Sequence, residues 1–200
     1  MPKVGMQKIR KPQLIEAAIS AINEYGFSGA TVSIIGKKAN VSPAIINHYF
    51  GGKSGLFDET MKSLIAEFFQ VLKHELNKPE NTTAHARVMA IVKASFSQSQ
   101  THPQVVKAWI GFWASSMHTK SLFRLQRVYS KRLQTTLVVE LKKELEVDQA
   151  RNVASTVCAL IDGMWLRGSL DGGINKAVTM QQIQYYLDLV MRYNHALRLQ

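Results

Sequence analysis

VSPAIINHYFGGKSGLF, the segment from Val41 to Phe57, joins a Ser-Pro pair to a short run that mixes polar and apolar side chains. Ser42 is a good N-cap and Pro43 suits the first helical position, so the pair predicts the start of a helix. Ile46 would anchor this helix on its apolar side. At about 100° per residue, the small and polar residues share the other side: Pro43, Ala44, Asn47 and His48.

A second short helix is predicted immediately before this segment. Thr31 is a good N-cap for it, and its apolar residues recur at helical spacing. Only Asn40 and Val41 separate its end from Ser42, and Asn is the non-glycine residue that best tolerates a positive φ angle. Two short helices joined in this way predict a helix-turn-helix over residues 31–50.

The polar side of the later helix has the properties of a DNA recognition helix. Small residues let a helix approach the major groove, and Asn47 and His48 can hydrogen-bond to base edges. Hydroxyl and ammonium groups around it suit phosphate contacts. The predicted DNA-binding residues are Thr31, Lys37, Lys38, Ser42, Pro43, Ala44, Asn47, His48, Tyr49 and Lys53. The alternative is a three-helix subdomain whose polar face is merely solvated.

The composition favours a polyanionic partner. The 200 residues include 25 Lys and Arg against 14 Asp and Glu, which gives a net charge of +11. Such an excess favours nucleic acid first and an anionic membrane surface second, although a merely basic soluble protein stays possible at this point. The single cysteine, Cys158, excludes an intrachain disulfide framework. Since the N-terminus lacks a secretory pattern and no apolar run is long enough to span a bilayer, we expect a cytoplasmic protein that does not enter the membrane.

The periodicity predicts an all-α fold of about nine helices, with no strand. The first three helices would form an N-terminal helix-turn-helix domain over residues 1–55, and residues 56–200 a helical domain for ligand binding and dimerisation. Asp148 and Thr179 are predicted as N-caps, the latter in a capping box with Gln182. The helices expected outside the helix-turn-helix cover residues 10–25, 53–76, 83–100, 103–118, 121–146, 148–170 and 179–197.

Aromatic residues and one acid stand out in the C-terminal part. A quaternary ammonium ion cannot donate a strong N–H hydrogen bond, so proteins bind it with aromatic faces and a nearby carboxylate. The motifs WIGFW and ALIDGMWLR supply both, and the residues predicted to bind such a ligand are Trp109, Phe112, Trp113, Asp162 and Trp165. The alternative is that the aromatic residues belong to the core and that Asp162 pairs with Arg167 or another basic residue.

The N-terminal 70 residues resemble the TetR family of repressors. The shared pattern is a helix-turn-helix that ends in an aromatic pair, followed by Lys and a long fourth helix, here ATVSIIGKKANVSPAIINHYFGGKSGLF. Three features depart from that pattern: Asn40 replaces the usual turn glycine, Gly51 and Gly52 replace a polar N-cap, and Pro43 with Ala44 begins the recognition helix. The departures leave the operator preference open.

The resemblance also implies a function and an assembly. It implies a homodimer that pairs through helices at about 148–170 and 179–197 and binds a palindromic DNA operator. The motifs KAWIGFWASSMH and ALIDGMWLR resemble family members that respond to choline and control the synthesis of glycine betaine, an osmoprotectant. The resemblance therefore implies a repressor relieved by choline, a small-molecule inducer, with no cofactor.

Two other functions remain as alternatives. The first is a TetR-type repressor that responds to another cationic or aromatic small molecule. The second is an all-α enzyme acting on a small amine, which would need a nucleophile with a positioned base or a set of metal ligands. The six histidines are scattered, and no metalloprotease, nucleophile-elbow or phosphate-loop motif occurs. We therefore do not expect an enzyme.

Overall fold

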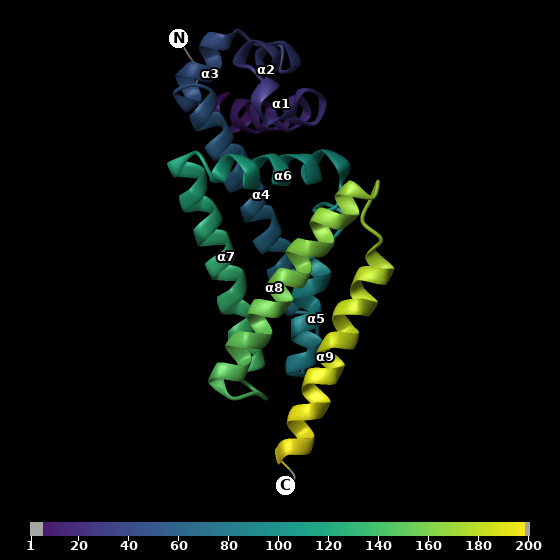
Figure 1. Ribbon diagram of the computed structural model, residues 1–200. Helices are drawn as coiled ribbons and strands as arrows, with labels where there is room; N and C mark the ends of the chain where they lie inside the picture. The colour runs from purple at the N-terminus through teal and green to yellow at the C-terminus, as the bar shows by residue number, and fades with distance from the viewer. Residues whose placement is uncertain (1–5, 199–200) are drawn as a thin grey trace. The chain divides into compact units, whose positions relative to one another are not determined.

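The computed structural model describes residues 6–198, with side chains described as far as Arg192, and this part of the chain contains nine helices and no strand. The all-α prediction is confirmed within these residues. The helices are α1 Met6–Gly29, α2 Val32–Lys38, α3 Pro43–Phe50, α4 Lys53–Leu76, α5 Ala84–Ser95, α6 Pro103–Ser116, α7 Lys120–Leu141, α8 Val147–Leu170 and α9 Lys176–Arg198 (Figure 1). Among the described residues, none of these helices is both long and apolar enough to cross a bilayer.

The chain divides into two compact units. The first unit contains the chain up to Glu67 together with His102–Arg127, and the second contains Phe68–Thr101 and the chain from Val128 onward. Helices α4 and α7 therefore contribute residues to both units. The predicted domains, 1–55 for DNA binding and 56–200 for ligand binding and dimerisation, divide the chain by function and not by packing. They stay a prediction.

The first unit is built around α1. This helix packs against α6 (Figure 1), and against α2 and α3. Its apolar face includes Leu14 and Ala18, both fully buried. Where α6 approaches the last turn of α1, Gly111 lies so near Phe27 that a Cβ atom on Gly111 would be 3.0 Å from the phenylalanine ring. Helix α1 is kinked at Gly26, which has φ 71°.

The turn between α2 and α3 depends on one residue predicted from the sequence and one that was missed. Asn40 has φ 52°, as its place in the turn predicts. The backbone N–H of Val41 then donates to the carbonyl of Gly36 at 2.9 Å. A Cβ atom on Gly36 would lie 2.8 Å from the carbonyl oxygen of Val41, so the turn closes only because residue 36 has no side chain.

In the connection from α3 to α4 the backbone segments approach one another even more closely than in the turn between α2 and α3. Gly51 caps α3 with φ 70° and Gly52 has φ 113°, values that L side chains rarely adopt. A Cβ atom on Gly55 would lie 1.8 Å from the carbonyl oxygen of Phe50. The first turn of α4 thus rests directly on the last residue of α3.

Gly55→Ala is expected to destabilise this first unit by about 3 kcal/mol or more, because the methyl group cannot fit against backbone and overpacking of this kind forces main-chain shifts. Circular dichroism melts would measure the loss. Ser54→Ala, one residue earlier at an exposed position, is the matched control and should change stability little. An unchanged melting temperature for Gly55→Ala would contradict the close contact.

The second unit packs α9 against α5 and α8. His85 Nε2 on α5 lies 2.9 Å from Asp188 Oδ1 on α9, so a polar contact joins these helices beside their apolar contacts. The core of this unit is formed by large aliphatic and aromatic side chains from five helices. They include Phe68, Leu72, Val88, Ile91, Leu137, Leu141, Ile161, Ile183 and Leu187.

A buried ion pair joins α5 to α7 inside the second unit. The side chain of Glu140 is 6% exposed and accepts two hydrogen bonds from the Arg87 guanidinium, one of them at 2.9 Å. Arg87 also donates to the backbone carbonyl of Leu76 at 3.0 Å, and Lys143 donates to Glu140. Hydrogen bonds from Arg87 and Lys143 lower the pKa of the Glu140 carboxyl despite its burial.

The predicted C-terminal end of α5 was wrong. The helix ends at Ser95 and does not continue to residue 100. Phe96 leaves the helical conformation, with φ −110°, and buries its side chain. The carbonyl of Ser95, which would otherwise lack a partner at a helix end, accepts the indole N–H of Trp165 at 3.0 Å. A hydrogen bond from a residue far along the chain therefore accompanies the end of α5 at Ser95.

Both predicted N-caps of the last two helices were also wrong. Glu146 has the extended cap conformation before α8, and Asp148 lies in the first turn, where it pairs with Arg151 at 3.1 Å. Helix α9 begins at Lys176 because the side chain of Asn175 accepts the N–H of Val178 at 3.2 Å. Thr179 is buried inside the helix, so the capping box does not form.

Candidate functional site

The predicted reading face of α3 exists as an exposed surface. Ile46, on the opposite side, is fully buried and holds the helix to the first unit. Packing of α3 against α1 and α2 completes that attachment. The four residues predicted to face the DNA groove are all exposed: Pro43, Ala44, Asn47 and His48. An anchored helix with a small, polar and accessible face has what base readout in a major groove requires.

The predicted phosphate-binding hydroxyls differ in what they do in the structure. Thr31 caps α2, and its side-chain oxygen accepts the N–H of Ile34 at 3.3 Å. Ser42 occupies the N-cap position of α3 but makes no side-chain capping hydrogen bond, and it is exposed. The ring of Tyr49 contacts the ring of His48 edge to face at 5.1 Å, which limits where the phenol can point.

Two of the three predicted lysines have contacts within the first unit. Lys53 Nζ donates to the carbonyl of Ser28 at 2.8 Å, and burial lowers the pKa of its ammonium group. Lys38 pairs with Glu24 at 2.6 Å. Lys37 is exposed. These contacts hold the lysines near the helix-turn-helix, and their role in phosphate binding stays a prediction.

The five predicted ligand-binding residues fall in both units. Trp109, Phe112 and Trp113 belong to α6 in the first unit, whereas Asp162 and Trp165 belong to α8 in the second. Whether they share one ligand site stays a prediction.

In the first unit the aromatic residues of α6 pack as core. Trp109 and Phe112 are almost fully buried, and their rings meet edge to face at 5.7 Å. Trp113 is half-buried, with its ring 6.3 Å from that of Trp109. The packing of Trp109 and Phe112 is what the alternative interpretation, aromatic residues as core, expected of them.

In the second unit Asp162 is a carboxyl on α8 whose pKa is perturbed. Its side chain is accessible, yet the surrounding protein desolvates it enough to raise the pKa of the carboxyl to about 6. Among the described residues Asp162 forms no ion pair with Arg167, one of the partners named by the alternative interpretation.

The pKa values of two other side chains respond to the charge of Asp162. Burial first, and the charge of Asp162 second, raise the pKa of the Tyr129 phenol and raise that of the Cys158 thiol to about 12. Cys158 stays a neutral thiol at physiological pH, and such a thiol is a poor nucleophile.

Tyr129 was missed in the sequence because it lies on α7, far from both aromatic motifs. Its ring is buried against Phe68 and Phe69 of α4, and the ring centroids are 5.5 and 6.1 Å from that of Tyr129.

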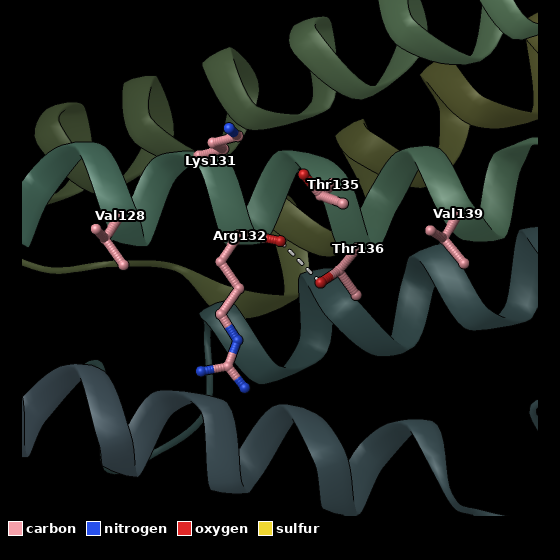
Figure 2. Close-up of a pocket in the computed structure, with 6 residues that line it drawn as sticks. All are labelled: Val128, Lys131, Arg132, Thr135, Thr136 and Val139. Atoms are coloured by element: carbon pink, nitrogen blue, oxygen red, sulfur yellow. Dashed lines mark hydrogen bonds between the residues drawn. The ribbon is translucent and has the colours of Figure 1, made fainter.

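A separate open groove of about 460 Å³ is lined by six residues of α7 (Figure 2). Figure 2 shows Arg132 and Lys131 extending to opposite sides, and the Arg132 guanidinium stacks on the Phe69 ring at 3.8 Å.

The comparisons with known proteins identify the class. Residues 14–60 match the model of bacterial regulatory proteins of the tetR family, and residues 84–192 match that of the C-terminal part of BetI-type transcriptional repressors. The chain belongs to the TetR family of bacterial regulatory proteins. More particularly, it is a TetR-type transcriptional repressor whose C-terminal region is of the BetI type.

Relatives match over nearly the whole chain. The HTH-type transcriptional regulator BetI of Vibrio campbellii is 44% identical over 199 residues, which cover 99% of this chain and 100% of the relative. BetI of Escherichia coli is 44% identical over 172 residues, covering 86% of this chain and 88% of that protein.

Solved structures agree on the fold. A transcriptional regulator from Pseudomonas aeruginosa superposes with a TM-score of 0.82 at 27% identity, covering 94% of this chain and 93% of that one. A regulator from Saccharomonospora viridis, solved in complex with choline, has a TM-score of 0.73 at 19% identity, with 89% and 95% coverage. At that identity the second likeness concerns the fold alone.

Proposed function

We propose that this repressor acts in the cytoplasm as a homodimer on a palindromic operator, controls genes that convert choline to glycine betaine, and releases DNA when it binds choline. Catalysis has no part in this proposal. The observation that carries it is the exposed face of α3, formed by Pro43, Ala44, Asn47 and His48, in a chain of the BetI type. This face would contact the edges of bases, while the surrounding hydroxyl groups and lysines would contact phosphates.

The outer surfaces of α8 and α9 support the homodimer. Both helices keep large apolar side chains exposed in the single chain, an arrangement that costs free energy in water and favours burial against a partner. They include Leu166, Leu170, Val178, Tyr185 and Leu189. A two-fold dimer would place its recognition helices in successive major grooves about 34–36 Å apart, and so would require a palindromic site.

Asp162 supports a cationic ligand. An accessible and desolvated carboxylate gains most from a cation that has little hydration of its own to lose, and a quaternary ammonium is such an ion. The resemblance to choline-responsive repressors and the choline bound by the regulator from Saccharomonospora viridis point to the same chemical class.

Ligand and operator would be coupled through two conformations of the dimer. Choline can weaken operator binding only by the ratio of its affinities for the two conformations, and the operator must weaken choline binding by the same factor. Helix α4 is suited to transmit the change, because it is continuous from Lys53, just after α3, to Leu76 in the second unit.

Asn47→Ala is expected to weaken binding to operator DNA by about 5- to 150-fold, the loss of one good base contact, and to leave binding to unrelated DNA unchanged. Lys37→Ala should instead weaken binding to both DNAs and lower the salt dependence by about one ion. Fluorescence anisotropy with DNA from upstream of the protein's own gene, at several salt concentrations, separates the two effects. Equal losses on both DNAs for Asn47→Ala would contradict base readout.

Choline titrated into the complex of repressor and operator at fixed salt tests the inducer. Choline should lower operator affinity, while a neutral molecule of the same shape should not. If choline leaves the affinity unchanged and another cationic or aromatic molecule lowers it, the alternative ligand class holds.

A further inference from the structure

The open groove on α7 follows a regular stripe of exposed side chains. Four of the residues that line it occur at intervals of four, three and four positions: Val128, Arg132, Thr135 and Val139. This alternation keeps side chains on one side of a helix and is the spacing at which one helix packs against another. All four residues are exposed, the two valines by 64% and 55%. We call this side of the helix, with its groove, the α7 face.

The groove of the α7 face is mostly apolar. Figure 2 shows Val128 and Val139 at its two ends, with Thr135 and Thr136 between them. The hydroxyl of Thr136 donates to the backbone carbonyl of Arg132 at 2.8 Å, so this polar group is used within the helix (Figure 2). Two exposed valines on one side of a helix cost free energy in water and favour burial against a partner.

The charges along α7 are almost all positive. The helix contains five Lys and Arg, all of them exposed, and one acid, Glu140, which is buried in its ion pair with Arg87. Lys131 lines the groove and forms no ion pair among the described residues. The Arg132 guanidinium stacks on the Phe69 ring at 3.8 Å, which leaves the N–H groups at its edge able to donate. Two cations and no acid therefore line an apolar groove.

This combination of charge and apolar area fits a protein helix better than DNA, a membrane or a second copy of the chain. DNA would use the cations but would leave the valines in water. An anionic membrane favours Trp, Phe and Leu on an apolar face, whereas valine and threonine occupy this one. Two copies that met through α7 would bring the same cations together, and like charges oppose such an interface.

We propose that the α7 face is the docking surface for an acidic amphipathic helix of another protein. The apolar side chains of the partner, three and four residues apart, fill the groove between Val128 and Val139, and its flanking carboxylates pair with Lys131 and Arg132. The stripe covers about three helical turns, so the complex is weak and transient. This inference depends on neither the operator nor the inducer of the proposed function.

A synthetic helix tests the charge and the spacing of the α7 face. The probe is a fluorescein-labelled peptide of about three heptads, with leucine at the seam positions and glutamate at the flanking positions. A second peptide has lysine in place of each glutamate. Anisotropy with the full-length repressor should show that the acidic peptide binds about tenfold more tightly than the basic one, or more, and that salt weakens its binding.

Substitutions in the groove locate the binding surface. Lys131→Glu should weaken binding of the acidic peptide by about 2- to 30-fold, because it removes one exposed charge pair and creates a like-charge contact. The double substitution Val128→Ser with Val139→Ser should weaken it by about tenfold, because apolar contact is lost at both ends of the groove. The matched controls are an equal charge change on α9, Lys176→Glu, and a substitution on α7 outside the groove, Gln134→Ser. Each control should change the affinity by less than about twofold.

Equal losses in Lys131→Glu and Lys176→Glu would overturn the proposal, because net charge alone would then explain the binding. It would also fail if wild-type protein did not bind the acidic peptide, or if the two valine substitutions left the affinity unchanged. All substituted side chains are exposed, so the variants should fold, and circular dichroism checks this.

Two further measurements separate the other partners. An unrelated DNA duplex should leave the acidic peptide bound, and complete displacement would place the peptide on the DNA-binding surface and overturn the proposal. Vesicles of phosphatidylglycerol should not bind through the α7 face. Vesicle binding that is lost in Lys131→Glu, without binding of the acidic peptide, would assign the face to a membrane instead.

Discussion

Glu140→Ala is expected to lower the free energy of unfolding by about 3–5 kcal/mol, because it leaves the Arg87 guanidinium without its carboxylate inside the second unit. Arg87 would keep only its bonds to backbone carbonyls, among them that of Leu76 at 3.0 Å. Urea denaturation followed by circular dichroism measures the change. Glu144→Ala, about one helical turn later in the chain, loses one hydrogen bond to the N–H of Ala84 and serves as a milder control.

The pH dependence of stability provides a second measure of this ion pair. Because the folded protein lowers the pKa of Glu140, the carboxylate stabilises the fold at pH values above its unfolded pKa of about 4.3, and this contribution is lost as the pH falls below that value. Glu140→Gln should therefore lose the most stability relative to wild type near neutral pH and progressively less at pH 4 and below. A difference that does not depend on pH would contradict a charged pair.

Asp162→Asn is expected to weaken choline binding by about 30-fold or more, the cost of removing one partner of a desolvated charge pair, and to raise thermal stability in the absence of ligand. The second effect follows from the raised pKa. Since the fold disfavours the ionised carboxylate, stability in the wild type falls as the pH rises from about 4 to 6. The stabilisation by Asp162→Asn should therefore be complete above pH 6 and fade toward pH 4.

Choline binding should have the opposite pH dependence. Below pH 6 the Asp162 carboxyl of the ligand-free protein is protonated, so a cation that binds must displace a proton. The dissociation constant for choline should therefore rise about tenfold for each unit by which the pH falls below 6. Thermal melts and titrations between pH 5 and 8 test both effects. Asp148→Asn is the matched control, since the Asp148 side chain is 91% exposed and pairs with Arg151. Ligand affinity that does not change in Asp162→Asn would exclude this carboxylate from the site.

The helix-turn-helix could be predicted from the sequence because its signals are local. The wheel of α3 depends only on residue spacing, and the positive φ of Asn40 depends on its place between two helix signals. Thr31 caps α2 as predicted, and the bounds of α4 agree with the long apolar stripe that begins after Lys53. Each of these features is decided within one or two helical turns.

The ends of the later helices could not be predicted in the same way. Thr179 and Asp148 are both good N-caps by residue type, but Asn175 and Glu146 take those positions. Several residues near a helix start have similar cap preferences, so burial of neighbouring side chains decides among them. Ser95 ends α5 through a bond from Trp165, a residue 70 positions away.

The sequence by itself determined the all-α class and the recognition face of α3, because both follow from local spacing. It also drew attention to Asp162 as a candidate ligand-binding residue, because this acid interrupts an apolar run. Only the tertiary structure decided that the Tyr129 ring is buried against Phe68 and Phe69 and that Trp109 and Phe112 are buried in the core of the first unit. The physical reason is that desolvation and contact between aromatic rings depend on which helices pack together, and the spacing of residues along one helix does not contain that information.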